Sequence, residues 1–554
     1  MFEYPLSRIC IASSSSGSGK TTLTCGILRA LMNRGYRPAA FKCGPDYIDP
    51  LFHREAVGAF SSNLDLFFCN EEAIVRLLHE NTQAGDIAVL EGVMGFYDGL
   101  GGTTTGASTW RLAQATDTPV ILVENCAGLS VSVAARIKGL AVFREDSHIH
   151  GVVLNRVKEK LYPALKALIE KETGITVLGR LPFLEDCVIE SRHLGLVTPE
   201  ELGDLKEKIG RLARRIEQDL DMDAIIRLAQ SAPPLTPAGG GSPGNEEDPS
   251  SSPFVNDEGP GVSVNPLEVC CASRIKPPKI ALEAIFYLAN SVEPKVRSTP
   301  VNRDFCGADG AKIHKCNRLL GNTGDLDRGC GISLFHPITG AKTRPRLGIA
   351  RDRAFCFYYE DSLNLLKKLG AELVFFSPLH DRRLPAGLNG LYLGGGYPEL
   401  YGAPLADNQV MREDIRKALE SGMPCIAECG GFMYLHRTLV DAQGIPYPLA
   451  GFFPGSCVKK DHPVRFGYAA YTAKSDNLLC PRGGVIRGHE FHYWDSDNPG
   501  DDFIAIKPVW GETWPAAVAT AALYAGFPHL YLYSVPSMAR RFLERCKTWR
   551  TSHE

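Results

Sequence analysis

The sequence lacks any uninterrupted apolar run of the ~18 residues that a membrane-spanning helix needs. Its N-terminus lacks an apolar segment behind a basic start, so we expect no secretion signal and no membrane partner. It carries little excess charge: 60 basic and 63 acidic residues leave a net charge of −3. That balance argues against a nucleic-acid-binding protein and leaves local basic sites open. With only 17 cysteines among 554 residues, a disulfide scaffold is excluded, and we expect free thiols in a reducing cytoplasm.

Short apolar runs alternate with amphipathic segments over residues 1–230, which predicts a doubly wound parallel α/β domain. A helix should follow the first run, because Leu23, Ile27, Leu28 and Leu31 share one face, and Gly35 should end it. The expected strands are Arg8–Ala12, Ala39–Cys43, Ile87–Leu90, Val120–Val123 and Val152–Leu154.

Residues 231–344 form an insertion of different composition. Its first 30 residues are rich in Pro, Gly and Ser, and we expect a long, disordered linker. A metal module and an artefact of the gene model are the alternatives. Such a module would use Cys306, His314, Cys316 and Cys330. These residues lack the paired C-x-x-C spacing that is typical of zinc sites.

Residues 345–554 return to strand–helix alternation and predict a second doubly wound α/β domain. The expected strands are Leu347–Ala350, Leu373–Phe376, Leu391–Leu393 and Cys425–Ala427, and the expected helices are Ser362–Leu369 and Asn408–Ser421.

A Ser/Gly loop at 13–22 joins the first strand to the first helix and predicts a phosphate-binding loop. Lys20 would reach the β and γ phosphates, and the Thr21 hydroxyl would bind Mg²⁺. The usual first glycine of the motif is replaced by Ser14. We predict that ATP contacts Ser16, Gly17, Ser18, Gly19, Lys20, Thr21 and Thr22.

Two acidic segments follow the second and third strands, Phe41–Pro50 and Glu91–Gly99. Ligands of open α/β sheets bind outside the carboxyl ends of the strands, and carboxylates there suit a hard cation. The alternative for either segment alone is a capped acidic turn.

Cys429 lies where a strand turns sharply into a helix, and we predict an exposed nucleophile whose pKa is lowered by the helix N-terminus. The N–H of Gly430 and one from the Gly394–Gly396 turn would form an oxyanion hole. The alternative is a buried structural cysteine.

A base must come from His462, His489, His492 or His529. We interpret the alternation in Gly488–Tyr493 as placing His489 and His492 on one face of a strand. No third ligand is evident, so we expect no metal there.

Together these segments resemble the cobyrinic acid a,c-diamide synthase family, which are ATP- and glutamine-dependent amidotransferases. The segments that carry the resemblance are the phosphate loop, Phe41–Pro50, Glu91–Gly99, Gly151–Val157, Ala354–Tyr359, Leu393–Leu400, Ala427–Gly431 and Gly488–His492.

The resemblance implies a P-loop domain like that of dethiobiotin synthetases, followed by a flavodoxin-like class I glutamine amidotransferase domain. It implies Mg²⁺ on Thr21, Glu91 and one of Asp46 or Asp49, of which we choose Asp46, and adenine beside Asn155. It further implies that Cys429 is the nucleophile and His529 the base, with Gly395 and Gly430 at the oxyanion. The remaining acidic-segment residues would position substrate, and they are Lys42, Tyr47, Asp49 and Asp98. Class I triads carry a Glu two residues after the His; Tyr531 stands there, so we expect a Cys–His dyad.

The expected reaction is the amidation of the a- and c-acetate groups of a corrinoid through acyl phosphates. Hydrogenobyrinic acid and nickel sirohydrochlorin are alternative substrates, and cobyric acid synthase chemistry fits the Phe41–Pro50 segment less well. A MinD/ParA-like ATPase switch would not need Cys429, and a non-catalytic binding protein is a further alternative. A homodimer is one possible assembly.

Overall fold

A computed structural model describes residues 6–82, 86–183, 199–235 and 344–551. All of these residues belong to one compact unit. Of the insertion predicted over 231–344, residues 236–343, with the alternative metal module, lie outside the described residues. The domain boundaries at 230 and 345 stay predictions, although helix α8 does end at Gln230.

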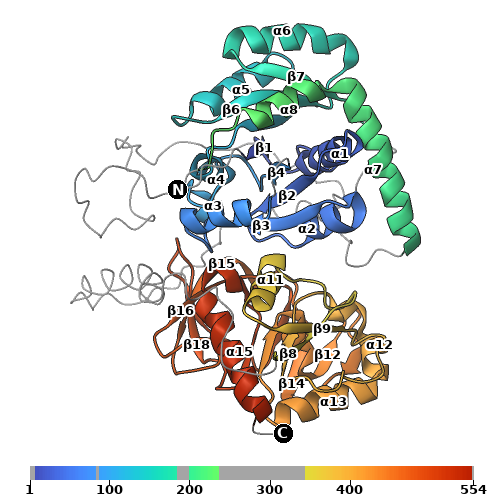
Figure 1. The fold of residues 1–554 in the computed structure, drawn as a ribbon, viewed down its shortest axis with the longest axis vertical. Coiled ribbons are helices and arrows are strands. Elements are labelled where there is room, and N and C mark those ends of the chain that lie inside the picture. Colours follow the sequence, from blue (N-terminus) through green and yellow to red (C-terminus); the bar gives the residue numbers. More distant parts are fainter. Residues whose placement is uncertain (1–5, 83–85, 184–198, 236–343, 552–554) are drawn as a thin grey trace, which may run out of the picture. The chain divides into compact units, whose positions relative to one another are not determined.

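The first domain is built on a sheet of seven parallel strands in the order β3-β2-β4-β1-β5-β6-β7 (Figure 1). The strands are β1 Ser7–Ser13, β2 Pro38–Cys43, β3 Phe60–Leu64, β4 Ile87–Glu91, β5 Val120–Asn125, β6 Ile149–Asn155 and β7 Thr176–Leu181. The helices are α1 Lys20–Asn33, α2 Ile48–Phe52, α3 Glu71–Glu80, α4 Thr109–Ala115, α5 Ser132–Val142, α6 Tyr162–Thr173, α7 Pro199–Asp219 and α8 Met222–Gln230. Short helical turns add η1 His53–Val57, η2 Leu100–Gly102 and η3 Glu159–Leu161.

Helices cover both faces of this sheet, so its strands are apolar on both sides. Successive side chains of a strand point to opposite faces. Ile9 and Ile11 of β1 accordingly join the core formed with α1, α7 and α8. Cys10 and Ala12 join the core on the other face, with residues of α3 to α6. The predicted doubly wound domain is confirmed.

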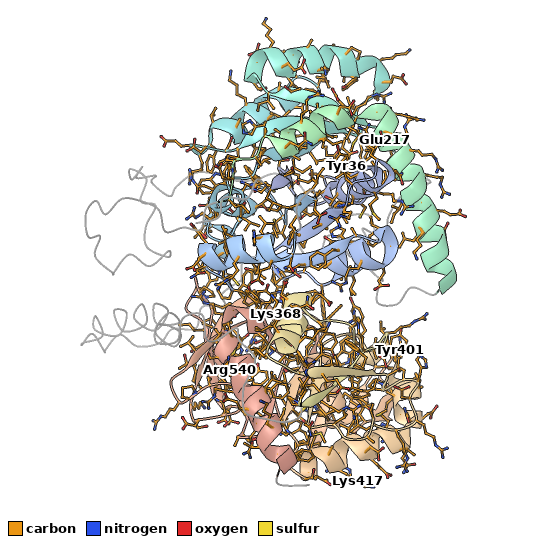
Figure 2. The ribbon with its side chains drawn as sticks, in the orientation of Figure 1. Tyr36, Glu217, Lys368, Tyr401, Lys417 and Arg540 are labelled. Carbon is orange, nitrogen blue, oxygen red and sulfur yellow. The ribbon has the colours of Figure 1, made fainter. Side chains whose placement is uncertain are left out.

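Helix α1 is the predicted helix behind the phosphate loop. Its predicted apolar face is buried, and Gly35 takes a φ of +85° just beyond its end. Helix α7 packs along α1, and the side chain of Glu217 accepts from Arg34 at 2.6 Å (Figure 2). The phosphate loop is therefore carried by a helix that is packed on two sides.

The second domain has a six-stranded sheet in the order β20-β21-β11-β10-β8-β9, parallel except for β20. Its strands are β8 Arg346–Ala350, β9 Glu372–Phe376, β10 Gly390–Leu393, β11 Cys425–Glu428, β20 Val518–Ala519 and β21 Leu523–Gly526. The helices are α11 Glu360–Lys368, α12 Gly402–Asp407, α13 Gln409–Glu420, α14 Gly430–Tyr434 and α15 Pro536–Thr551, with turns η9 Pro398–Leu400 and η10 Leu532–Ser534. All four predicted strands and both predicted helices are confirmed.

Two further sheets complete this domain, and we did not predict them. The four-stranded one contains β12 His436–Val440, β13 Pro446–Pro448, β14 Phe453–Lys459 and β17 Trp494–Ser496. The five-stranded one contains β15 Arg465–Ala473, β16 Val485–His492, β18 Phe503–Ile506, β19 Thr513–Ala516 and β22 His529–Leu530. The strand expected at Gly488–Tyr493 is part of β16.

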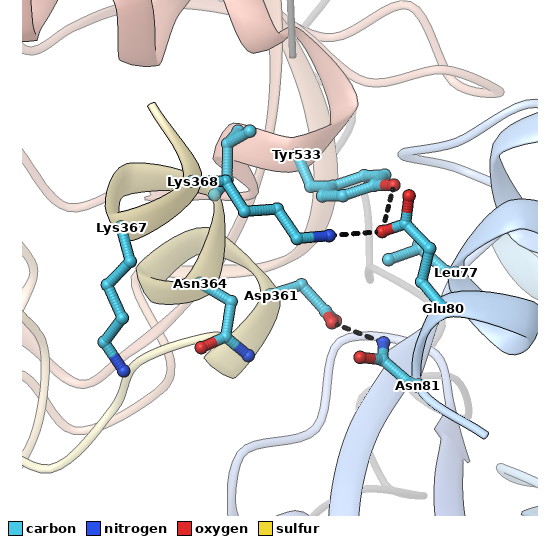
Figure 3. A pocket seen from close by; sticks show the side chains of 9 residues that line it. Leu77, Glu80, Asn81, Asp361, Asn364, Lys367, Lys368 and Tyr533 are labelled. Carbon is cyan, nitrogen blue, oxygen red and sulfur yellow. Dashed lines mark hydrogen bonds and ion pairs between the residues drawn. The ribbon is translucent and has the colours of Figure 1, made fainter. Parts of the chain in front are cut away.

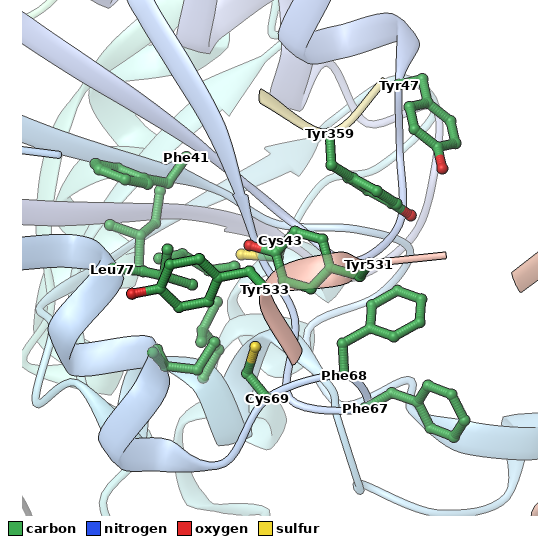
Figure 4. Close-up of a cluster of buried hydrophobic side chains, with 14 of the residues drawn as sticks. Phe41, Cys43, Tyr47, Phe67, Phe68, Cys69, Leu77, Tyr359, Tyr531 and Tyr533 are labelled. Carbon is green, nitrogen blue, oxygen red and sulfur yellow. The ribbon is translucent and has the colours of Figure 1, made fainter. Parts of the chain in front are cut away.

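Aromatic side chains of both domains share one buried cluster (Figure 4). The Phe68 ring lies 5.5 Å from that of Tyr531 and 6.0 Å from that of Tyr359. Buried polar contacts accompany it: Ser62 donates to Asp361, and Tyr468 donates to Asp65 at 2.8 Å. The two domains are therefore packed together through apolar and hydrogen-bonded contacts alike.

Candidate functional site

The phosphate loop runs from the end of β1 to the start of α1, as predicted. Gly17 and Gly19 take φ values of +70° and +99°, which L side chains adopt only with strain. Lys20 Nζ donates to Ser13 Oγ at 2.7 Å and to the Met94 carbonyl at 2.6 Å. Burial, with Lys42 nearby, lowers the pKa of Lys20 to about 8. The lysine is thus held at the end of the sheet, where phosphate would meet it.

Asn155 lies against this loop. Its Nδ2 donates to the Ser18 carbonyl at 2.8 Å, and a Cβ added to Gly19 would be 2.3 Å from that same Nδ2. The structure thus brings Asn155 to the predicted nucleotide site, but its amide nitrogen is engaged by the loop backbone. The predicted adenine contact stays a prediction.

A buried acidic cluster lies beside the loop. Thr21 Oγ1 donates to Glu91 Oε1 at 2.6 Å and to Asp49 Oδ2 at 3.4 Å. Lys42 Nζ pairs with Asp49 at 2.5 Å and with Glu91 at 3.0 Å, and His53 Nε2 is 2.9 Å from Glu91. Burial by itself would raise the pKa of Glu91, but Lys42 and His53 hold it well below its usual range.

Asp49, which we had assigned to the substrate, is the aspartate that contacts Thr21. Asp46, which we had assigned to the metal, accepts instead from the backbone N–H of Ile48 and Asp49 at the start of α2. Neither role is tested by this geometry. Of the two aspartates that the family pattern left open, the structure favours Asp49 as the one next to Thr21.

The Glu91–Gly99 segment closes the other side of the loop. The Asp98 carboxylate accepts from the Gly95 N–H at 2.8 Å, and the Phe96 N–H donates to the Ser13 carbonyl. Met94 takes a φ of +49°, an uncommon conformation for a residue with a side chain. These hydrogen bonds therefore hold a strained turn in the conformation that presents the Met94 carbonyl to Lys20.

Cys429 stands between β11 and α14, in the predicted strand–turn–helix. Its φ of +46° and ψ of −103° mark a strained turn, the kind of backbone that is found at active sites. Two expectations were wrong. The side chain is buried, at 7% exposure, and burial, with Glu399 nearby, raises the pKa of the thiol above its ordinary value. Helix α14 is too short, and its surroundings too acidic, for the helix N-terminus to offset burial.

The two predicted oxyanion residues are brought together. A Cβ on Gly430 would lie 3.0 Å from the Gly396 nitrogen, and one on Gly395 would lie 2.3 Å from His529 Cε1. The Gly395 carbonyl accepts from the N–H groups of Cys356 and Phe357, which fixes the turn. The glycine turn therefore lies against both the residue after Cys429 and the predicted base.

His529 is buried in β22, whose partner β16 places His489 opposite it. Burial, with His489 and His492 nearby, lowers the pKa of His529 to about 3, so the imidazole of the resting site is neutral. Tyr531 donates to Asp361 at 2.9 Å, which ties the residue at the usual third position of the triad to the domain interface. The prediction of a dyad without that Glu is consistent with this arrangement.

The prediction that His489 and His492 share a face of the strand was wrong. The register of β16 with β15 is uninterrupted, so residues three apart point to opposite faces. Glu490 and His492 share a face instead, with Nε2 and Oε2 3.0 Å apart, and the His492 ring stacks on Phe527. Across the described ranges, no group of three or more His, Cys, Asp or Glu could hold a metal ion.

Tyr47, predicted to position substrate, is buried among aromatic rings of the second domain. Its ring stacks on Phe357, with centroids 5.1 Å apart, and lies 4.5 Å from the ring of Tyr359 and 5.1 Å from that of His529. Tyr47, which lies in the same segment as Asp49, therefore contacts His529, the predicted base in the second domain.

Comparison with known proteins identifies both domains. Residues 9–196 match the CobQ/CobB/MinD/ParA nucleotide binding domain, and residues 346–520 match the CobB/CobQ-like glutamine amidotransferase domain. The cobyrinate a,c-diamide synthase of Caldanaerobacter subterraneus is 32% identical over 97% of this chain and 98% of its own. That of Thermoplasma volcanium is 34% identical over 99% of both chains.

The chain belongs to the cobyrinate a,c-diamide synthase family. Family membership makes it an amide-forming ligase that combines a P-loop nucleotide-binding domain with a glutamine amidotransferase domain. A solved glutamine amidotransferase covers 36% of this chain and 98% of its own, at 18% identity and a TM-score of 0.25. The family confirms the predicted resemblance and fold class. It disfavours the ATPase-switch alternative, which has no use for the second domain.

The amidotransferase match ends at residue 520, so it does not reach His529. The strained turn at Cys429 lies within it, and the phosphate loop and acidic cluster lie within the nucleotide-binding match. The assignment of His529 as the base therefore stays a prediction.

A pocket of about 230 Å³ lies elsewhere in this family member, between α3 and α11 (Figure 3). Lys368 pairs there with Glu80 at 2.6 Å, and Asn81 donates to Asp361 at 2.9 Å. The pocket is lined by residues of both domains, so it is a part of the domain interface. Its lining includes no residue of either predicted site, and its side chains pair with one another. Among the helices described, none is long and apolar enough to cross a membrane.

Proposed function

We propose that this protein uses ATP and glutamine to amidate the a- and c-acetate carboxylates of cobyrinic acid in cobalamin biosynthesis. The observation that carries the proposal is the presence of both half-sites on one chain that aligns with cobyrinate a,c-diamide synthases over nearly its full length. Cys429, on its strained turn, would release ammonia from glutamine. The phosphate loop with its acidic cluster would activate the corrinoid carboxylate.

The glutaminase half-reaction uses Cys429 and His529. His529 accepts the thiol proton as Sγ attacks the glutamine amide carbon, and the backbone N–H groups of Gly395 and Gly430 receive the developing oxyanion. His529 then gives the proton to the leaving ammonia, and water opens the thioester to release glutamate. A buried thiol with a raised pKa is unreactive until this transfer, which would limit glutamine hydrolysis without substrate.

The synthetase half-reaction would take place at the phosphate loop. A carboxylate of the corrinoid attacks the γ-phosphate, ADP leaves, and the acyl phosphate then reacts with ammonia to give the amide and phosphate. Lys20 and the loop N–H groups stabilise charge on the transferring group. Lys42, Tyr47 and Asp98 are proposed to position the substrate.

The residues present fit Mg²⁺. Thr21 offers a hydroxyl within hydrogen-bonding distance of the carboxylates of Asp49 and Glu91, and all three are the hard oxygen donors that Mg²⁺ prefers. Lys42 pairs directly with Asp49 and Glu91, and Lys20 lies close enough to interact with both carboxylates. Mg²⁺ bound there would neutralise charge on the β and γ phosphates.

Product analysis by mass spectrometry tests the proposal. The protein is incubated with ATP, Mg²⁺, glutamine and, separately, cobyrinic acid, hydrogenobyrinic acid and nickel sirohydrochlorin. We expect two amidations of cobyrinic acid, lost in Cys429→Ala with glutamine and restored with free ammonia. Amidation of only one of the other tetrapyrroles would reassign the substrate, and ATP hydrolysis without amidation of any of them would refute the synthase function.

A further inference from the structure

Glu428, the residue immediately before the nucleophile, is the one carboxylate among the described residues whose ion pair with His529 the structure records. Its Oε2 lies 3.8 Å from His529 Nδ1, and both side chains are almost fully buried. In the described part of the chain, His529 Nδ1 has no hydrogen-bond partner. A buried imidazole N–H without an acceptor is costly, so a nearby carboxylate oxygen is its natural partner.

The other oxygen of Glu428 is already fixed. Tyr392 donates its hydroxyl to Oε1 at 3.0 Å, and the Leu530 N–H donates to the same atom at 3.3 Å. The Leu530 contact comes from the residue after His529, so the carboxylate is tied to the backbone of β22 itself. These two donors leave Oε2 as the oxygen on the side of the imidazole.

We infer that Glu428 is the positioning residue of the glutaminase site: it accepts a hydrogen bond from His529 Nδ1–H and so leaves Nε2 as the base for Cys429. This rests on the proposed function, because it assumes that His529 accepts the thiol proton. Burial raises the pKa of Glu428 to about 8, and the positive charge that forms on His529 during the reaction favours the ionised carboxylate. The proton moves from Sγ to Nε2, and the resulting imidazolium is stabilised by Oε2. The distance must shorten by about 1 Å, as catalytic contacts commonly do when substrate binds.

The arrangement explains how the chain can lack a carboxylate at position 531. Tyr531 points to Asp361 at the domain interface and not to the imidazole. The carboxylate that would orient the base stands instead on the nucleophile's own strand, where it pairs in register with Gly526. Nucleophile and orienting group would then move as one rigid turn.

Other titratable groups lie near His529, and the test must distinguish their effects from that of Glu428. His489 on β16 pairs in register with His529 on β22, and His492 of β16 also lies near the imidazole. Glu490 is engaged by His492 and by the Tyr471 hydroxyl, the latter at 2.7 Å. The Tyr47 ring packs on the imidazole face. Glu490 is therefore the rival carboxylate.

The test measures kcat and KM for glutamine hydrolysis in the full chain, together with ammonia-dependent amidation as a measure of folding and of the synthetase half. Glu428→Gln should lower glutaminase kcat by at least about tenfold with little change in KM, and ammonia-dependent amidation should remain. Glu428→Asp should recover part of the loss, because it restores the charge. Tyr531→Phe, which alters the usual third position but keeps the ring, should leave kcat unchanged.

Three results would overturn the inference: unchanged kcat in Glu428→Gln, a loss in Glu490→Gln that matches or exceeds it, or an equal loss in Glu428→Asp and Glu428→Gln. Loss of ammonia-dependent amidation in Glu428→Gln would also count against it, because the effect would then be general. Absence of glutaminase activity in the unaltered protein would refute the proposed function instead.

Discussion

The buried cluster at Glu91 gives a quantitative prediction for the variant Glu91→Gln. Glu91 is fully buried and accepts from Thr21 at 2.6 Å and from Lys42 at 3.0 Å, and its second oxygen lies 2.9 Å from His53 Nε2. The amide has nearly the same shape but removes the charge that compensates Lys42, and it turns an NH₂ group toward one of these donors. The substitution therefore leaves a buried cation that is paired with Asp49 alone.

Removing one partner of a buried ion pair costs about 3–5 kcal/mol, and the remaining Asp49 contact favours the lower end. A loss of about 3 kcal/mol corresponds to a fall in Tm of about 6–12 °C for a domain of this size. The pH dependence follows from the depressed pKa of Glu91. Its contribution is complete above the unfolded value of about 4.3 and is lost as the pH falls through the lower folded value. The difference between the two proteins should therefore shrink below about pH 4.

Thermal unfolding of both proteins without ATP or Mg²⁺ measures this difference at pH 7 and at about pH 3, where the contribution of Glu91 is falling. Glu80→Gln is the matched control, because Glu80 also pairs with a lysine, Lys368, at 2.6 Å, but at the surface. An exposed pair contributes at most about 1 kcal/mol. Equal Tm shifts for Glu91→Gln and Glu80→Gln, or a Glu91→Gln deficit that does not change with pH, would refute the reasoning.

Three further predictions concern catalysis. Asp49→Asn should raise the Mg²⁺ concentration needed for ATP hydrolysis by at least about tenfold, whereas Asp46→Asn should mainly weaken the start of α2, by about 1 kcal/mol; a Mg²⁺ titration of both variants decides between the aspartates. Gly19→Ala should lose most ATP binding, measured by calorimetry, because its Cβ would lie 2.3 Å from Asn155 at a φ of +99°; binding within about twofold would contradict the geometry. Tyr47→Ala should lower stability by about 3 kcal/mol and raise the ratio of glutamate to amide formed, while Tyr47→Phe should not; an unchanged ratio would remove any link between its ring and glutamine hydrolysis.

The apolar strands could be predicted from the sequence because a continuous run of apolar side chains indicates a strand that is buried on both faces. Runs such as Ile87–Leu90 are apolar throughout and proved to be central strands. Strand β3 was missed because Ser61, Ser62 and Asn63 look like a surface turn. They are buried because partners distant in the sequence satisfy them: Ser62 donates to Asp361, and Asn63 donates to the carbonyls of Gly44 and Asp46.

The site was predictable to the same extent. The phosphate loop and the Cys429 turn carry local patterns in which each residue type has a chemical reason. The state of Cys429 was not predictable, because its burial depends on elements that the local pattern does not contain. Glu428 gave no signal of its own, since a Glu at a strand end is common and its partner lies in β22. Only the pairing of β11 with β21, and of β22 with β16, brings the two together.

In the proposed reaction, ammonia would pass within one packed unit and not between tethered domains, because the two domains contact each other. Separating them would expose the aromatic cluster to water. It would also exchange the buried bonds of Ser62 with Asp361 and of Tyr468 with Asp65 for bonds to water, at a net cost of about 0.5–1.5 kcal/mol each. The same packing joins the two sites through a short stretch of chain: the Tyr47 ring lies on His529, and Asp49, two residues later, contacts Thr21. A shift of this stretch when nucleotide binds would reach the base without crossing the core. That connection is the physical reason to expect glutamine hydrolysis to respond to the phosphate site, and removing the Tyr47 ring should break it.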